Sequence, residues 1–175
     1  RLQKFDILQY IDYLKNTHDY FQKIQVPTVE KHINMLTVRA EGNKNLQLIQ
    51  KFFLDYKNDL LEHIQIEENQ IFPYLRNINQ LSKSTFDKQK FEDLTKYQPL
   101  NNFIDQHQNL DNKLFDLQNI IIKYLNGNFS EELTHAVIVE LFHLENEIKN
   151  HTKLEEQIVI PMGIEIEESL KVNLQ

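Results

Sequence analysis

The chain has 175 residues, a formal net charge of −7 and no cysteine. Its length predicts a single domain, residues 1–175, with a sizeable core. The absence of cysteine excludes disulfides, thiolate metal sites and cysteine nucleophiles. The scattered Lys and Arg residues do not make a nucleic-acid footprint. No apolar run approaches the roughly 18 residues of a membrane span, and no signal peptide is visible, so we expect a cytoplasmic protein.

Four long helices are expected, because only three Gly and four Pro residues interrupt the chain. Their expected bounds are about residues 4–40, 44–72, 99–126 and 131–159. Pro27 lies within the apolar stripe of the first helix and should kink that helix without ending it. Gly42 should follow the end of the first helix, and Pro99 should open the third.

The connections are unequal in length. The first and third are short, whereas residues 76–98 form a long one with a short helix near 86–94. Residues 163–175 should form a short tail. Four long helices joined in this way predict an all-α, up-down-up-down four-helix bundle.

Two stretches of eleven residues follow one pattern: a His, a Glu four residues later, a second Glu beside it, and a Pro ten residues after the His. They are residues 63–73 and 151–161. On a helix, positions i and i+4 lie on one face, so each stretch directs one imidazole and one carboxylate to the same place. Pro73 and Pro161 should mark the ends of their helices.

A further His precedes each stretch at nearly the same distance: His18 lies 45 residues before His63, and His107 lies 44 residues before His151. The two halves of the chain thus form a pseudo-repeat, which implies a pseudo-two-fold axis. We expect six side chains to meet near one end of the core as a metal site. They are His18, His63, Glu67, His107, His151 and Glu155.

Two buried carboxylates need cations, since an unpaired buried charge costs several kcal/mol. Arg and Lys are missing from the matching core positions, which favours metal ions. Two ions, each bound by two His and sharing both Glu as bridges, would use every ligand. An oxo or hydroxo bridge would then leave an open position on each ion. A solvated cluster on an outer face is disfavoured by the neighbouring Leu60, Ile64 and Ile71.

Other histidines suggest competing patterns. His143 and Glu147 repeat the i,i+4 spacing but lack the trailing proline, which is typical of an ordinary helix pair. The Glu-x-x-His motif of ferritin-like bundles occurs twice, ending at His135 and His143, but both copies lie on one predicted helix. His32 lies roughly 21 Å along the helix from His18 and should be a surface residue. Asp111, one turn beyond His107, is either solvated or an outer partner of the site.

The motifs resemble the hemerythrin-like (HHE) cation-binding domain over nearly the whole chain, and most narrowly the RIC proteins, which repair iron centres. The resemblance rests on four pairs of residues, one in each predicted helix. The pairs are His18 with Pro27, His63 with the Glu-Glu-Asn-Gln-Ile-Phe-Pro run of residues 67–73, Pro99 with His107, and His151 with Pro161. The oxygen-carrying hemerythrins have a fifth His at the place of Asp111 and an Asp as one bridge, which here is Glu155. RIC proteins often have Glu where this chain has Gln106.

The resemblance implies a non-haem di-iron protein, with two oxo- or hydroxo-bridged iron ions and Glu67 and Glu155 as bridging carboxylates. It implies a role in repairing iron–sulfur clusters damaged by nitrosative or oxidative stress, with O2 or NO as the small-molecule ligand and damaged iron–sulfur proteins as partners. The alternative is a hemerythrin-like module that binds or senses oxygen or nitric oxide without repair activity.

Overall fold

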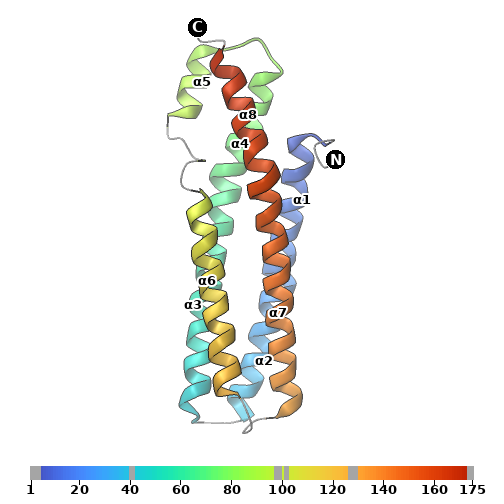
Figure 1. Ribbon diagram of the computed structural model, residues 1–175, viewed down its shortest axis with the longest axis vertical. Coiled ribbons are helices and arrows are strands. Elements are labelled where there is room, and N and C mark those ends of the chain that lie inside the picture. The colour runs from blue at the N-terminus through green and yellow to red at the C-terminus, as the bar shows by residue number, and fades with distance from the viewer. Residues whose placement is uncertain (1–4, 40–41, 97–99, 101–102, 126–129, 173–175) are drawn as a thin grey trace.

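The computed structural model describes residues 5–39, 42–96, 100, 103–125 and 130–172, apart from the side chains of 103–106 and 108. All regular elements in these residues are helical, and they form a tall antiparallel bundle (Figure 1). The expected all-α bundle is thus confirmed. Within the same residues, no helix combines the length and the apolar character that a membrane span requires.

The first arm of the bundle is α1 (Ile7–Tyr20), a π-helical turn η1 (Phe21–Gln25) and α2 (Val26–Arg39), which follow one another without a break. Asp6 caps its start, because the Asp6 side chain accepts a hydrogen bond from the Leu8 backbone N–H while Gln9 bonds back to Asp6. Pro27 lies inside this arm, and the helix continues through it as expected.

The second arm is α3 (Lys44–Ile66), η2 (Glu67–Ile71) and α4 (Phe72–Ser82). The short α5 (Lys88–Thr95) lies in the long connection, close to the short helix expected there. The third arm is α6 (Phe103–Tyr124), and the fourth is α7 (Glu131–Leu154), η3 (Glu155–Val159) and α8 (Ile160–Lys171). The expected start of the third helix at Pro99 and its expected end at residue 126 lie outside the described residues.

Two expected helix ends were wrong. The second helix was expected to end at residue 72 and the fourth at 159, but they run on to Ser82 and Lys171, so most of the expected tail is α8. The reason is the π turn before each proline. The residue before Pro73, Phe72, donates its N–H to the carbonyl five residues back instead of four. This wider turn accommodates the proline ring, which in an α-helix would clash with the carbonyl one turn earlier.

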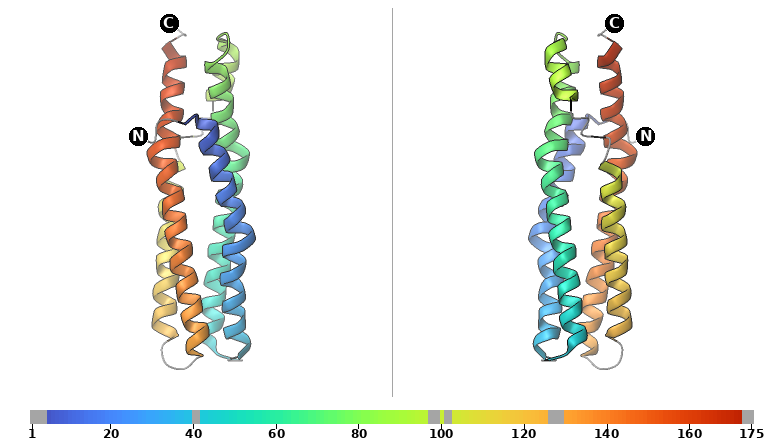
Figure 2. Two further views of the ribbon diagram at one scale, coloured as in Figure 1. Left: turned by 90° about the vertical axis from the view of Figure 1, so that its right-hand side faces the viewer. Right: turned by 90° about the vertical axis from the view of Figure 1, so that its left-hand side faces the viewer.

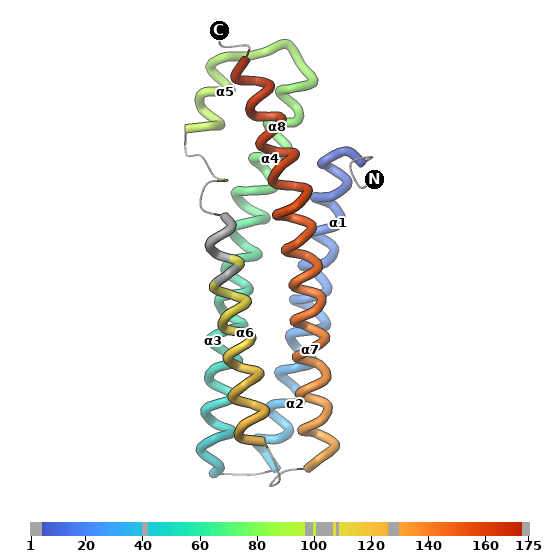
Figure 3. The backbone as a smooth tube through the Cα atoms, in the orientation of Figure 1, coloured from blue at the N-terminus to red at the C-terminus, as the bar shows by residue number. Residues whose placement is uncertain are grey.

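The four arms pack as a square. α2 lies against α3 and α7, and α6 lies against α3 and α7, so neighbours around the square alternate in direction (Figures 1 and 2). Figure 3 shows that the second and fourth arms extend beyond the start of α6, where α4 packs against α8. Gly163 allows this approach, because a Cβ at that position would fall 2.4 Å from Leu75 Cδ2.

The bundle contains two separate apolar cores. The lower core lies between α2, α3, α6 and α7, and the upper core between α1, α4, α5 and α8. The lower core includes Ile33, Ile49, Phe53, Leu114 and Val137, and the upper core includes Leu14, Phe72, Leu75, Phe91 and Ile160. The six predicted site residues belong to neither core. They lie between the two, and not near one end of a single core as expected.

Candidate metal centre

The structure brings all six predicted side chains together. They come from α1, α3, η2, α6, α7 and η3, and none of the six residues is more than 7% exposed. Six polar side chains at such depth need partners for their nitrogen and oxygen atoms, because burying an unpaired polar group is costly.

The i,i+4 spacing predicted two of the contacts. His63 Nε2 lies 2.6 Å from Glu67 Oε1, and His151 Nε2 lies 3.2 Å from Glu155 Oε1. In both arms the His is in the last turn of an α-helix and the Glu is the first residue of the following π turn. The repeated sequence therefore produces the same local geometry twice.

Glu67 is central to the cluster. Its Oε2 lies 2.8 Å from His18 Nε2, and its Oε1 lies 3.5 Å from His107 Nε2, in addition to the contact with His63. Glu155 contacts His107 and His151, each at 3.2 Å between Nε2 and a carboxylate oxygen. Each carboxylate therefore faces histidines from more than one helix.

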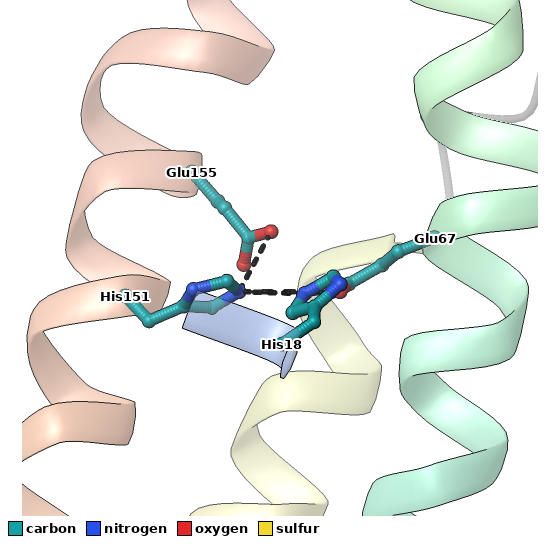
Figure 4. Close-up of side chains that lie close together, drawn as sticks. All are labelled: His18, Glu67, His151 and Glu155. Carbon is teal, nitrogen blue, oxygen red and sulfur yellow. Dashed lines mark hydrogen bonds and ion pairs between the residues drawn. The ribbon is translucent and has the colours of Figure 1, made fainter. Parts of the chain in front are cut away.

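The histidines form two pairs. His18 Nε2 and His151 Nε2 face one another at 3.1 Å (Figure 4), and the His63 and His107 rings lie 4.7 Å apart between centroids. The sequence left this pairing open. An exchange of the two halves of the chain carries His18 to His107 and His151 to His63, so the two pairs are consistent with the pseudo-two-fold axis.

Two sets of ligand atoms are compact enough to surround a metal ion. In each set, the donor atoms lie within 4.8 Å of one another. The first set is His18, Glu67, His151 and Glu155, and the second is His63, Glu67 and His107. Because Glu67 belongs to both sets, its carboxylate has the position of a bridge between two ions.

The second Glu of each repeat holds a histidine from the preceding arm. His18 Nδ1 lies 2.9 Å from Glu68 Oε1, and His107 Nδ1 lies 3.0 Å from Glu156 Oε1. The sequence showed both Glu residues but gave them no role. A carboxylate on the outer nitrogen orients the ring and makes the inner nitrogen a better ligand.

Thr17 has the same role for His151. Its hydroxyl donates to the Leu14 carbonyl oxygen at 2.7 Å, so its oxygen accepts from His151 Nδ1 at 2.6 Å. A hydroxyl has one proton, and this proton is already used. Sequence reasoning missed Thr17, and no spacing pattern marks it. In His18, His107 and His151, the outer nitrogen is therefore the donor, and in the neutral ring Nε2 directs a lone pair inward.

These inward lone pairs meet oxygens that lack donors. Among the residues that the structure describes, Glu67 Oε2 and both carboxylate oxygens of Glu155 have no hydrogen-bond partner, although imidazole nitrogens lie close to them. Lone pairs that face carboxylate oxygens repel one another unless a cation lies between them. The donor set of imidazole and carboxylate suits iron, zinc and related ions, so the residues present fit a metal centre.

Without metal, protons would balance the charge. Burial alone disfavours charged groups, but contacts with Glu155 and Glu67 outweigh it and raise the pKa of His107 to about 10 and that of His151 to about 9. Burial likewise disfavours the carboxylate of Glu67, yet the four neighbouring histidines, which donate to it when their Nε2 atoms carry protons, hold the pKa of Glu67 well below its usual range. The cluster thus strongly favours bound positive charge.

The competing histidines lie elsewhere. His135 and His143 are exposed on α7, so neither Glu-x-x-His motif nor the third i,i+4 pair contributes to the cluster. His32 is half-buried, where an exposed position was expected, and it also lies outside both ligand sets.

A small cavity adjoins five of the six residues on the side of the lower core, with a capacity of about one water molecule. Its walls are the histidines and Glu67, together with mostly apolar neighbours. These neighbours are Phe21, Leu60, Ile64, Leu110, Asp111, Ile148 and Thr152. Asp111 is half-buried here, and burial is the main cause that raises its pKa. It therefore lies beside the cluster and is not fully solvated.

The model of the hemerythrin HHE cation-binding domain matches residues 9–163, a span that contains all six residues. The chain belongs to the hemerythrin HHE family. Neither a curated protein nor a solved structure matches it. As an HHE domain, the protein is a metal-binding helical module, and the histidine and glutamate clusters between its two cores are where the structure could hold metal.

Proposed function

We propose that the protein is a non-haem di-iron protein that takes part in the repair of iron–sulfur clusters damaged by nitrosative or oxidative stress. The observation that supports this proposal is the pair of ligand sets that share Glu67. Each set contains two histidines, Glu67 is common to both sets, and Glu155 belongs to the first.

In this proposal, His18 and His151 bind one ion, His63 and His107 bind the other, and Glu67 and Glu155 bridge them. Two iron ions with an oxo or hydroxo bridge would supply redox chemistry and an open position for a diatomic molecule. Glu68, Glu156 and Thr17 orient three of the rings. The six residues are buried, at most 7% exposed, which limits the access of bulk water to the ligands.

The ligand set also supports a role in supplying iron. Imidazole and carboxylate ligands must lose their protons to bind metal, so protons compete with iron and help it to leave. Asp111 stands at the place where oxygen-carrying hemerythrins have a fifth histidine. The damaged iron–sulfur proteins would be the partners that receive this iron.

The test is cluster reassembly on a damaged iron–sulfur dehydratase, under anaerobic conditions. The diferrous protein should restore more activity than the same amount of free ferrous iron. A variant with Glu67→Ala and Glu155→Ala, loaded with as much iron as it retains, should restore less than the wild type. Equal restoration by free iron and by the protein would refute the repair function.

The second candidate is a module that binds or senses O2 or NO without repair. It is favoured by the cavity beside the ligands, because a small space between the ligand side chains and a mostly apolar wall suits a diatomic molecule. Reversible oxygen binding by the diferrous protein, without any cluster reassembly, would establish this function in place of repair.

A further inference from the structure

A surface pocket of about 210 Å³ lies between α3 and α6 and reaches the candidate centre. Its walls are Asp59, Glu62, His63, Ile66, Asn109 and Leu110. Two of these residues, His63 and Leu110, also line the inner cavity. Among the side chains that the structure describes, this pair therefore stands between the pocket and the cavity.

His63 is both a wall of this pocket and a member of a ligand set. Its Nε2 lies 2.6 Å from Glu67 Oε1, and the residue is 7% exposed. An ion held by His63 and His107 would be the one nearer the pocket. Its set has three members, whereas the set around His18 and His151 has four.

The mouth of the pocket is acidic. Asp59 and Glu62 lie on the surface of α3, and Asp59 pairs with Lys113 across the rim. Both partners of this pair are more than a third exposed, so the ion pair is weak and the Lys113 ammonium can be displaced by another cation. Carboxylates at a pocket mouth raise the local concentration of cations.

A second acidic pocket lies on the α1 side and is lined by Asp12, Lys15, Asn16, Asp19 and Glu68. It contains no member of either ligand set. Glu68 separates it from His18, which is fully buried. This pocket is thus a natural control for the first, because it is also acidic but has no ligand residue in its wall.

We propose that divalent iron enters and leaves the centre through the pocket between α3 and α6, past His63 and Leu110, and that the ion bound by His63 and His107 exchanges first. This inference rests on the proposed di-iron centre. Beyond that centre, it specifies the route of the iron, the selection of cations by the acidic residues at the pocket mouth, and the order in which the two ions exchange.

The first test replaces the charges at the two pockets in turn. An Asp59→Asn, Glu62→Gln variant is compared with an Asp12→Asn, Asp19→Asn control, and each removes two negative charges. Stopped-flow measurements follow ferrous iron entering the apo-protein and leaving the diferrous protein for a chelator. If the cation passes Asp59 and Glu62, removing their charges raises the energy barrier that the ion crosses on entry and on exit. Loading and release of the first ion should both slow on the order of threefold to tenfold, with affinity nearly unchanged.

The control variant should change both rates by less than about twofold, because its charges lie off the route. Equal slowing in both variants would mean a general field effect and would overturn the route. Slower release in the control alone would move the route to the α1 side and also overturn it.

The second test changes the wall. Leu110→Ala should speed release of the first ion, whereas Leu114→Ala should not, because both leucines belong to the lower core but only Leu110 lines the α3–α6 pocket and the inner cavity. Both substitutions truncate a buried leucine and should cost similar stability. Equal release rates in the two variants would therefore refute the role of Leu110 as a barrier on the route. A wild-type protein that takes up no iron would contradict the proposed function itself. Two irons taken up and released at equal rates in all variants would refute the route alone.

Discussion

The two glutamates that bond to the outer ring nitrogens of His18 and His107 give the most specific prediction. Glu68 holds His18 and Glu156 holds His107, and the two side chains are 32% and 33% exposed. Loss of such an outer partner lowers metal affinity about 10- to 100-fold. Because a third of each carboxylate is solvated, we expect the lower end, about tenfold or 1.4 kcal/mol, for Glu68→Ala and for Glu156→Ala.

The effects should be specific to one ion. In a His107→Ala background, only the ion of His18 and His151 should remain, and Glu68→Ala should weaken its binding about tenfold while Glu156→Ala changes it less than about twofold. In a His18→Ala background, the order should reverse. Ferrous titration against a chelator, without oxygen, measures both affinities. Equal losses from both substitutions in each background would refute the assignment of the outer carboxylates.

Three further results are expected. His143→Ala should leave metal content unchanged, whereas His151→Ala should lose at least one ion; equal losses would identify His143 as a ligand. Metal should stabilise the fold by about 2.7 kcal/mol at 100 times its Kd, so equal melting temperatures with and without iron would exclude a buried site. In the metal-free protein, the pKa of His151 is raised to about 9 and that of His107 to about 10. Their stabilisation should be complete below about pH 6.5 and lost as pH rises through 9 to 10, which urea midpoints at several pH values measure.

Much of the cluster was predictable because its spacing is local. His63 and Glu67 share a helix face whatever the rest of the chain does, and the second copy at His151 and Glu155 made coincidence a poor explanation. His18 and His107 needed only a bundle in which the two halves are equivalent. The four-helix fold followed from the scarcity of Gly and Pro.

The remaining features depend on how helices meet. The pairing of His18 with His151, the contact of Glu68 with a ring on another helix and the role of Thr17 are set by the packing of the arms, which sequence spacing does not contain. The helix ends at Pro73 and Pro161 were wrong for a different reason. The rule that proline ends a helix assumes bonds from residue i to i−4, and the π turns provide another bond instead.

The π turn of the first arm also sets how α1 and α2 are rotated relative to one another. An α-helix turns about 100° per residue, so Leu14 in the upper core and Ile33 in the lower core, nineteen residues later, would point about 100° apart in a uniform α-helix. The additional residue that η1 accommodates brings both to the inside. Insertion or deletion of one residue between 21 and 25 would therefore rotate the first arm's side chains out of one of the two cores without changing any ligand. The same change near Gly42, beyond the end of α2, would rotate nothing.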